Sequence, residues 1–240
     1  MPSLAEVYSR AAEENKAAVM SLMQPVAGGV LVDVGCWDGS DSVKLRDHAG
    51  ASTVIGLDLA DQFLAPARER GVDFRQVDLA ERWPLEDESV DALHSNQVIE
   101  HLAATDHFMR EIRRVLKPDG YAVVSTNNLS SWHNVVALTL GWQPLPCHVS
   151  DDAVVGNPLA LEETPYDERI HRHLRIFTGK ALRELAEAHG LALDEEIGSG
   201  YYPLVGRAAH AMAQIDRRHS VYLVQRYRRA TGLRTGTSRS

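Results

Sequence analysis

A glycine-bearing turn between an apolar segment and a predicted helix is the first part of the chain that could bind a ligand. Gly35 and Gly39 follow the apolar residues 30–34, which predict a β-strand. Glycines in such a turn let the backbone bend sharply and come close to a ligand. Asp33, two residues before Gly35, adds a negative charge that suits a ligand with a positive amino group.

Two further acids are expected at the same edge of the sheet. Asp58 ends the second predicted strand, 19 residues after Gly39, and Asp78 ends the third. An acid about 20 residues after the glycine turn is placed to accept hydrogen bonds from both ribose hydroxyls of an adenosine. Asp78 offers another acceptor beside the same crevice. The spacing therefore predicts a cofactor that contains adenosine.

The glycine spacing also separates two classes of cofactor. A dinucleotide fingerprint requires Gly-x-Gly-x-x-Gly, but counted from Gly35 the second and third positions hold Trp37 and Ser40. A pyrophosphate would meet an indole at Trp37 and would gain nothing from Asp33. S-adenosylmethionine, whose amino group is positive, fits this turn better. A nicotinamide-dependent oxidoreductase stays as the alternative enzyme class.

The motifs taken in order resemble those of the class I S-adenosylmethionine-dependent methyltransferases, in particular the group similar to the ubiquinone and menaquinone biosynthesis methyltransferases. Besides the acids and glycines above, the resemblance rests on residues 89–102 around the fourth predicted strand and on residues 116–121 before the fifth. It covers residues 28–128. The resemblance implies a Rossmann-like α/β fold, with an open, mostly parallel seven-stranded sheet, helices on both faces and an antiparallel last strand.

The resemblance also implies roles for single positions. Asp33 and the backbone amides around Gly35 would hold the methionine end of the cofactor. Asp58 would hold the ribose. Asp78 and the amide of Leu79 would hold the adenine.

The segment from Ser95 to Val98 would lie along the methionine chain. The complete predicted cofactor-binding set is Asp33, Gly35, Cys36, Gly39, Asp58, Leu59, Asp78, Leu79, Ser95, Asn96 and Val98. One position departs from the family, which usually has glycine where this chain has Trp37. The indole must therefore point away from the cofactor or cover it.

Two histidines are the predicted catalytic residues. Methyl transfer to a hydroxyl or an acidic carbon requires removal of a proton, and histidine is the natural base near neutral pH. His101 follows the fourth predicted strand, at the carboxyl edge where ligands of open α/β sheets bind. His173 lies at the exit of an insertion between the fifth and sixth strands. We favour His101, because a strand end fixes its position.

The segment around His173 allows other roles. Its alternation predicts one shared face for His171, His173, Arg175 and Phe177. Two histidines one residue apart could also bind a metal, with a shell completed by His148, Asp151 or Asp152. Nothing in the sequence brings those partners close, so the prediction includes no metal. Arg175 could pair with an acidic substrate group or with another carboxylate of the protein.

The elements that must position these residues follow from the periodicity of the sequence. Short β-rich runs alternate with helical segments, which predicts parallel strands joined by helical crossovers. The predicted strands are 30–34, 53–57, 72–77, 90–95, 121–125, 191–197 and 221–227. The predicted helices are 4–23, 105–116 and 178–190, and residues 117–120 predict a turn.

We expect one methyltransferase domain over the 240 residues. Its parts would be an N-terminal helix in 1–27, a cofactor-binding core in 28–126, a substrate-covering insertion in 127–172, the rest of the sheet in 173–230 and a disordered tail in 231–240. The insertion is polar around one apolar segment. Such a segment is where a lid or a substrate pocket would be built.

Composition and charge exclude several other classes of protein. The longest apolar run falls far short of the roughly 20 residues that span a bilayer, and the first residues carry no basic region, so we expect a cytoplasmic protein. Cys36 and Cys147 are too few for a disulfide framework. Residues 217–240 hold seven arginines and no acid, and subtracting these seven charges from the net −8 leaves −15 on the rest. An acidic body argues against binding of duplex nucleic acid.

The predicted function is methyl transfer from S-adenosylmethionine to a small-molecule acceptor, with oxygen as the first candidate atom and carbon or nitrogen next. Methylation of nucleobase amines is disfavoured. The enzymes that perform it resemble one another in an Asn-Pro-Pro-Tyr or Asp-Pro-Pro-Tyr turn, and here the corresponding residues are Ser95-Asn96-Gln97-Val98. A non-catalytic protein that senses S-adenosylmethionine is a further alternative. A monomer or a homodimer is expected.

Overall fold

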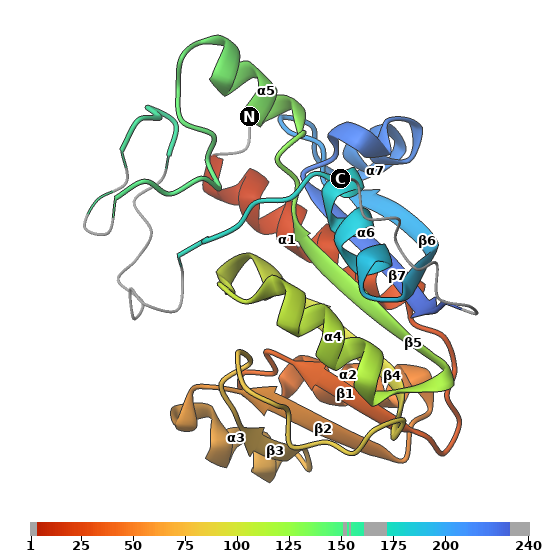
Figure 1. The fold of residues 1–240 in the computed structure, drawn as a ribbon. Helices are drawn as coiled ribbons and strands as arrows, with labels where there is room; N and C mark the ends of the chain where they lie inside the picture. Colours follow the sequence, from red (N-terminus) through yellow and green to blue (C-terminus); the bar gives the residue numbers. More distant parts are fainter. Residues whose placement is uncertain (1–3, 151–152, 154, 161–171, 231–240) are drawn as a thin grey trace, which may run out of the picture.

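The computed structural model describes residues 4–150, 153, 155–160 and 172–230. Its strands are β1 (Val30–Val34), β2 (Thr53–Asp58), β3 (Asp73–Gln76), β4 (Val90–Asn96), β5 (Leu116–Asn127), β6 (Leu191–Ser199) and β7 (Tyr222–Arg229). The strands form one sheet in the order β3-β2-β1-β4-β5-β7-β6 (Figure 1). β1 to β5 pair in parallel, whereas β7 is antiparallel to both β5 and β6. The predicted fold, including the antiparallel last strand, is confirmed.

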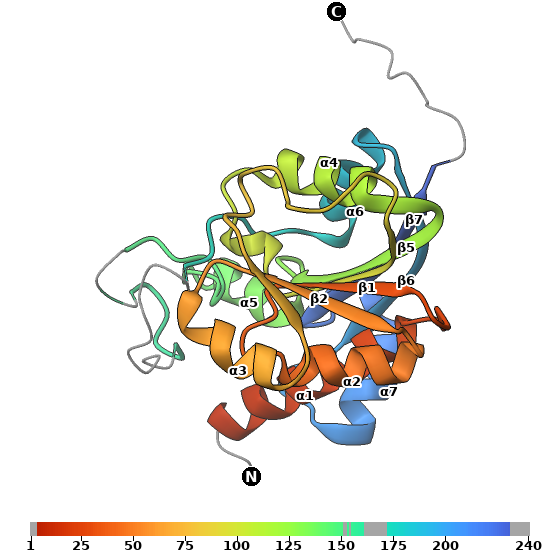
Figure 2. The same cartoon turned by 90° about the horizontal axis from the view of Figure 1, so that it is seen from below.

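Helices cover both faces of the sheet (Figure 2). One face carries α1 (Leu4–Leu22), α2 (Ser40–Ala49), α3 (Leu64–Glu69) and α7 (Gly206–Ile215), and the other carries α4 (Thr105–Val115) and α6 (Gly179–Ala188). The helix α5 (Trp132–Thr139) belongs to the insertion after β5, and short 3-10 turns occur at η1 (Asp61–Phe63), η2 (Ile99–His101) and η3 (Arg217–His219). None of the helices in the described ranges is both long and apolar enough to cross a membrane.

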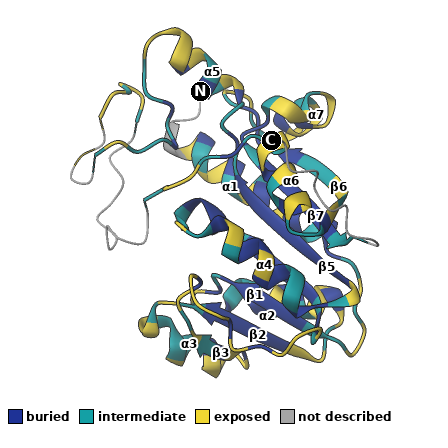
Figure 3. Ribbon diagram, in the orientation of Figure 1, coloured by how far each residue is buried: buried dark blue, intermediate teal, exposed yellow. Residues whose placement is uncertain are grey.

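Side chains that alternate along the strands pack into two apolar layers. Val32 and Val34 of β1 pack with Ile112 of α4 on one face. Leu31 packs with Leu45 of α2 on the other face. The central strands are therefore buried from both sides (Figure 3), which explains why their sequences are almost continuously apolar.

The predicted turn at residues 117–120 is wrong. These residues lie within β5, which runs from Leu116 to Asn127. Val90 of β4 pairs with Leu116, but Ala92, only two residues later, pairs with Tyr121. The extra residues of β5 therefore form a bulge in a continuing strand, and Pro and Gly are tolerated there because a bulge interrupts the ladder of hydrogen bonds.

The helix α7 has no counterpart in the sequence prediction. It begins at Gly206, and its N-cap, Val205, gives no side-chain hydrogen bond. Its buried residues are the small Ala209 and Ala213. Alanine favours a helix but adds little to the apolar periodicity that reveals one, so this helix gave no clear signal.

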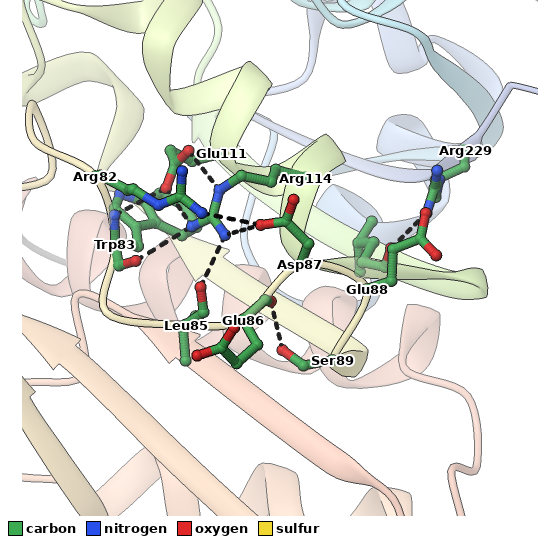
Figure 4. Close-up of polar contacts among 11 residues, drawn as sticks. Arg82, Trp83, Leu85, Glu86, Asp87, Glu88, Ser89, Glu111, Arg114 and Arg229 are labelled. Atoms are coloured by element: carbon green, nitrogen blue, oxygen red, sulfur yellow. Dashed lines mark hydrogen bonds and ion pairs between the residues drawn. The ribbon is translucent and has the colours of Figure 1, made fainter.

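The connection between β3 and β4 is fastened to α4 by Arg114 (Figure 4). The Arg114 guanidinium donates to the backbone oxygens of Trp83 and Leu85, at 3.1 and 2.8 Å. It also pairs with Glu111 and Asp87, each at 2.7 Å. This one side chain thus holds the loop that follows Asp78, one of the predicted cofactor residues.

The arginines of β7 take part in ion pairs within the protein. Arg226 is buried and contacts Asp194 at 2.6 Å and Glu195 at 2.8 Å. Arg229 contacts Glu88 at 2.6 Å (Figure 4). Much of the basic charge near the end of the sequence therefore neutralises neighbouring carboxylates, while residues 231–240 lie outside the described part of the chain.

Candidate functional site

The turn after β1 is shaped by two glycines and a tryptophan. Gly35 and Gly39 have φ values of +77° and +75°, in the left-handed region that favours glycine. A Cβ on Gly35 would lie 2.5 Å from Cγ2 of Val98, so the turn packs directly on the segment after β4. Trp37 also has a positive φ, 48°, and its indole stacks on Phe63 with ring centroids 5.0 Å apart. The indole that replaces the family's glycine thus lies over the segment after β2.

Asp58 lies at the tip of β2 and faces this turn. Its Oδ2 accepts a hydrogen bond from the backbone N–H of Trp37, and its Oδ1 accepts one from Ala60, both at 3.0 Å. Each carboxylate oxygen has more than one lone pair, so these bonds leave room for ribose hydroxyls. The carboxylate is therefore held at the end of β2, next to the glycine turn.

The residues predicted for the adenine follow β3. Asp78 is exposed, and its Oδ1 accepts a hydrogen bond from Ala80 at 2.9 Å. The side chain of Leu79 belongs to the apolar core, so only its backbone can meet a ligand. The side chain of Leu59, by contrast, is 58% exposed beside Asp58.

Cys36 is a packing residue rather than a reactive thiol. Its side chain is buried, and a Cβ on Gly56 would lie 2.5 Å from its Sγ. Burial raises the pKa of the thiol far above its usual range, and the charges of Asp33 and Asp58 raise it further. Any contact of Cys36 with a cofactor would therefore come from its backbone.

Asp33 is buried and makes two strong side-chain contacts. Its Oδ1 lies 2.6 Å from Nδ1 of His94, and its Oδ2 accepts a hydrogen bond from the hydroxyl of Ser42 at 2.5 Å. Asp33 and His94 lie side by side in the parallel register of β1 and β4. The carboxylate that was predicted to hold the methionine end of a cofactor thus orients His94.

The end of β4 carries an unsatisfied polar group. The buried Ser95 hydroxyl has no hydrogen-bond partner among the described residues. Asn96, the next residue of β4, is held by Asn15 of α1, whose side-chain amide donates to Asn96 Oδ1 at 2.7 Å. The hydroxyl groups of Ser125 and Ser199 both donate to Oδ1 of Asn15, at 3.0 and 3.1 Å. The helix α1 is therefore fastened to this edge of the sheet by a buried amide.

A cavity of about 240 Å³ opens between α1 and α2 beside these residues. His94 and Asn96 form part of its wall, together with the charged residues Glu13, Lys16, Asp41 and Lys44. Charges of both signs suit the amino acid part of S-adenosylmethionine. The carboxylate of Asp58, the orphaned hydroxyl of Ser95 and this cavity together fit that cofactor.

The two predicted catalytic histidines come together. The rings of His101 and His173 have centroids 4.9 Å apart, and His148 stacks on His173 at 5.0 Å. Nδ1 of His101 lies 3.0 Å from the backbone oxygen of Arg172, and Nδ1 of His173 lies 3.0 Å from that of Pro146. Of the metal ligands considered from the sequence, His171, Asp151 and Asp152 lie outside the described residues.

Glu100 is a site residue that the sequence interpretation did not single out. Its carboxylate is fully buried beside His101 and accepts hydrogen bonds from Thr126 at 2.9 Å and Asn127 at 3.3 Å. Burial raises the pKa of Glu100 to about 7. Its backbone oxygen accepts from Leu174 and Arg175, which ties η2 to the segment that returns from the insertion.

The predicted shared face of residues 171–178 is wrong for the described part of that segment. Phe177 is buried in the core beside β5, where it bridges Asn128, whereas Arg175 is exposed. The Arg175 guanidinium donates a long hydrogen bond, 3.4 Å, to the backbone oxygen of Ala103. The segment bends where it meets Glu100, so strict alternation does not hold.

A second cavity, of about 160 Å³, is apolar. It is lined from three parts of the chain by Val7, Tyr8, His133, Val136, Ala137, Trp142, Leu145, Asn157, Leu159, Tyr202 and Pro203. The hydroxyl groups of Tyr202 and Tyr222 are hydrogen-bonded, and the charge of Glu100 raises the pKa of Tyr222 in addition to the larger effect of burial. Leu145 of the cavity wall is followed by Pro146, whose backbone oxygen lies 3.0 Å from Nδ1 of His173, so the chain leads directly from this cavity to the histidine cluster.

His133 is the titratable residue in this cavity that sequence reasoning missed. Burial lowers its pKa to about 4, so the ring is neutral near pH 7. Its ring lies 4.8 Å from that of Tyr202. His133 lies within the segment predicted to build the substrate pocket, which was the available signal, but its periodicity did not distinguish it from the other histidines of the insertion.

The fold and these groups define a Rossmann-like protein that binds an adenosine cofactor at the carboxyl edge of its sheet. Residues 32–124 match the family model described as a methyltransferase domain. A Mycolicibacterium smegmatis protein named as a probable S-adenosylmethionine-dependent methyltransferase is 34% identical over 171 residues, which cover 70% of this chain and 63% of that protein. The chain thus spans less than two thirds of the length of this relative.

The ubiquinone biosynthesis O-methyltransferase of Chromobacterium violaceum is 30% identical over 190 residues, covering 75% of this chain and 71% of the relative. The solved structure of an S-adenosylmethionine-dependent methyltransferase from Mesorhizobium loti has a TM-score of 0.59 at 20% identity, covering 89% of this chain and 96% of that one. This chain belongs to the class I S-adenosylmethionine-dependent methyltransferases. S-adenosylmethionine is its cofactor, and the predicted family is confirmed.

Proposed function

We propose that this protein transfers a methyl group from S-adenosylmethionine to a small-molecule acceptor, with oxygen as the first candidate atom and carbon or nitrogen next. The observation that carries the proposal is the apolar cavity around Tyr8, His133 and Tyr202, whose wall at Leu145 is followed by Pro146, the residue that contacts His173. A methyl donor held at Asp58 and a methyl acceptor held in this cavity approach the same edge of the sheet. The bound cofactor supplies an electrophilic methyl group on sulfur.

In the proposed complex, groups at the carboxyl edge of the sheet hold the cofactor. Asp58 accepts hydrogen bonds from the ribose, and Asp78 with the amide of Leu79 receives the adenine. His94, oriented by Asp33, and Asn96 face the amino acid part. Ser95 supplies a hydroxyl that its protein neighbours leave unsatisfied.

The lining of the cavity favours a flat, largely apolar acceptor. Aromatic and aliphatic side chains form most of its wall, with His133 and Tyr202 as polar groups that can orient a hydroxyl. The resemblance to an enzyme named ubiquinone biosynthesis O-methyltransferase supports oxygen as the methylated atom. The insertion, which supplies His133, Trp142 and Leu159, covers the acceptor.

His101 and His173 are the proposed groups for removal of the acceptor's proton. Both rings lie at the carboxyl edge of the sheet, and a backbone oxygen fixes Nδ1 of each. Methyl transfer is an in-line displacement, so the protein must hold the acceptor oxygen opposite the C–S bond that breaks. The walls of the cavity provide that orientation.

The experiment is a screen of phenols, catechols and aliphatic alcohols with isotopically labelled S-adenosylmethionine. The expected result is label in at least one hydroxyl acceptor, and loss of that product in a Tyr202→Ala variant that still binds S-adenosylhomocysteine. Label appearing only in carbon or amine acceptors would move the methylated atom away from oxygen. Cofactor binding without transfer to any acceptor class would contradict the proposed activity.

A further inference from the structure

Three side chains that can bind metals meet beside the acceptor cavity. One donor atom each from Glu100, His101 and His173 lies within 4.8 Å of donor atoms of the other two. Glu100 and His101 belong to η2, and His173 belongs to the segment that returns from the insertion. We infer that these three residues bind a divalent transition-metal ion, although the sequence alone led us to include no metal.

The two histidines are held in the state that metal binding requires. A ring nitrogen that donates its proton to a backbone oxygen leaves the lone pair on the other nitrogen, and metal-binding histidines are commonly oriented in this way. Nδ1 of His101 contacts the oxygen of Arg172, and Nδ1 of His173 contacts that of Pro146, each at 3.0 Å. Nε2 of each ring is then the ligand.

Glu100 adds the negative charge of the site. Its carboxylate is completely buried, and burying an ionised carboxylate is costly unless charge and hydrogen bonds compensate for it. Thr126 and Asn127 hold its two oxygens from the end of β5, so its position is fixed. A cation bound between Glu100 and the imidazoles would supply the compensating charge.

The ligand types define the class of metal. Two imidazole nitrogens and one carboxylate oxygen suit zinc and other first-row divalent transition metals, whereas calcium and magnesium prefer sets of oxygen ligands. Zinc with three protein ligands keeps a fourth position for water or a substrate atom. A zinc ion held by these three residues would therefore keep one position for water or an acceptor atom.

Binding requires a modest movement of one ligand. Two ligand atoms on tetrahedral zinc, with bonds of about 2.0–2.1 Å, lie about 3.4 Å apart, which is closer than the 4.8 Å limit of the present cluster. Glu100 is fixed by its hydrogen bonds to β5. His173 lies in a stretch without a regular strand or helix, so its side chain is the one that approaches.

The chemical role of the ion deepens the proposed function and rests on it. With Nε2 of both rings bound to the ion, the imidazoles no longer accept the proton of the acceptor, and the ion takes over its activation. An acceptor hydroxyl at the open position would lose its proton to water more readily, because the cation stabilises the resulting oxygen anion. The oxygen lone pair then forms the new O–CH3 bond while the S–CH3 bond breaks and its electron pair returns to sulfur. The products are the methyl ether and S-adenosylhomocysteine.

The binding test uses the full chain, stripped of metal with a chelator and titrated with Zn²⁺ by calorimetry. The wild type is expected to bind one equivalent, and His101→Ala, His173→Ala and Glu100→Gln are each expected to bind about 100-fold more weakly or worse. His189→Ala is the control, because the His189 ring contacts Asp106 at 2.8 Å and belongs to no group of three potential metal ligands among the described residues. Equal zinc affinity in the wild type and in the His101→Ala/His173→Ala double variant would overturn the site.

A second readout separates this inference from the proposed function. S-adenosylhomocysteine affinity is measured for the same four variants and is expected to stay within about two-fold of the wild type, because the cluster does not touch Asp58 or Asp78. Turnover that is lost on chelation and restored by Zn²⁺ would support the role in acceptor activation. Full turnover by the metal-free enzyme would overturn that role, whereas zinc binding without any methyl transfer would contradict the proposed function alone.

Discussion

Asp58, the proposed ribose ligand, holds the glycine turn through a single carboxylate. Its two oxygens accept the backbone N–H groups of Trp37 and Ala60, so the same group that would bind ribose also orders the turn. A hydrogen bond to a charged group contributes about 1.5 to 3 kcal/mol, and more when it is buried. Recognition of adenosine should therefore depend strongly on this residue.

We expect Asp58→Ala to weaken binding of S-adenosylmethionine and S-adenosylhomocysteine by about 10- to 150-fold, which corresponds to 1.5 to 3 kcal/mol. Titration calorimetry measures the change. Asp58→Asn keeps the shape of the side chain and should weaken cofactor binding less than Asp58→Ala does. Asp61→Ala removes an exposed carboxylate three residues further along and is the matched control. An unchanged affinity in Asp58→Ala would remove Asp58 from the site.

His133 should make the stability of the protein depend on pH. Burial lowers its pKa to about 4 in the folded chain, against about 6.5 when unfolded. Protonation therefore favours the unfolded state, and the stability associated with a neutral His133 is lost as the pH falls from about 6.5 toward about 4. At pH 5 the loss is about 2 kcal/mol relative to pH 7.5.

Urea unfolding of the wild type and His133→Gln at pH 7.5 and pH 5 checks this expectation. The glutamine cannot titrate, so the variant should lose about 2 kcal/mol less than the wild type between the two pH values. All other titrating groups are common to both proteins. Equal losses would mean that His133 is already accessible to protons in the folded state.

The residues of the site divide by how their positions are determined. Asp58 and Asp78 could be predicted because the carboxyl ends of neighbouring parallel strands meet at one edge. His94 lies beside Asp33 because β1 and β4 pair in this particular register. The register of two strands cannot be read from the sequence. Glu100 and His133 depend on how the insertion returns to the sheet. Sequence spacing predicts which side chains share a strand edge, but it misses side chains that long connections bring together.

Among the elements, α4 holds the loop after β3 through Arg114 (Figure 4). Burial acts to raise the pKa of Glu111, but the hydrogen bonds from Arg114 and from the amide of Trp83 outweigh it, so the pKa is lowered. The carboxylate is therefore charged in the interior. Removing only its cationic partner leaves that charge uncompensated.

We expect Arg114→Met to lower the free energy of unfolding by about 3 kcal/mol, near the lower end of the values for broken buried ion pairs. Chemical denaturation at pH 7 measures it. The additional substitution Glu111→Gln removes the uncompensated buried charge and should restore part of the lost free energy of unfolding. A loss below about 0.5 kcal/mol in the single variant would show that the pair acts like an exposed one.

The strands and helices that could be predicted are those with one dominant sequence signal, such as an apolar run or a helical apolar periodicity. The apolar runs of β1, β2 and β4 and the amphipathic α4 appear close to the expected positions. The Thr178 cap is also present, since its hydroxyl oxygen accepts from Ala181 at 3.2 Å. The bulge in β5 was missed because Lys117–Gly120 has the composition of a turn, and only pairing with β4 continues the strand through it.

At the scale of the whole molecule, the cofactor crevice and the acceptor cavity are built by different parts of the chain. The crevice uses the ends of β1, β2 and β4, which belong to the compact sheet. The cavity uses the start of α1, the insertion and the turn after β6. Under the proposed function, methyl transfer requires both to be complete at once, and we expect closure of the insertion over the acceptor to be the step that joins them.

The insertion should therefore become protected when both ligands are bound. Several of its apolar side chains are exposed, with Val136 52%, Leu140 55% and Leu159 50% accessible. An acceptor in the cavity would cover part of this surface and reduce local opening of α5 and residues 140–150. Hydrogen–deuterium exchange is expected to slow there with acceptor and S-adenosylhomocysteine together, and to change little with S-adenosylhomocysteine alone. Peptides from α6, which do not line the cavity, are the internal control, and identical exchange of the insertion in all three states would contradict its role as a cover.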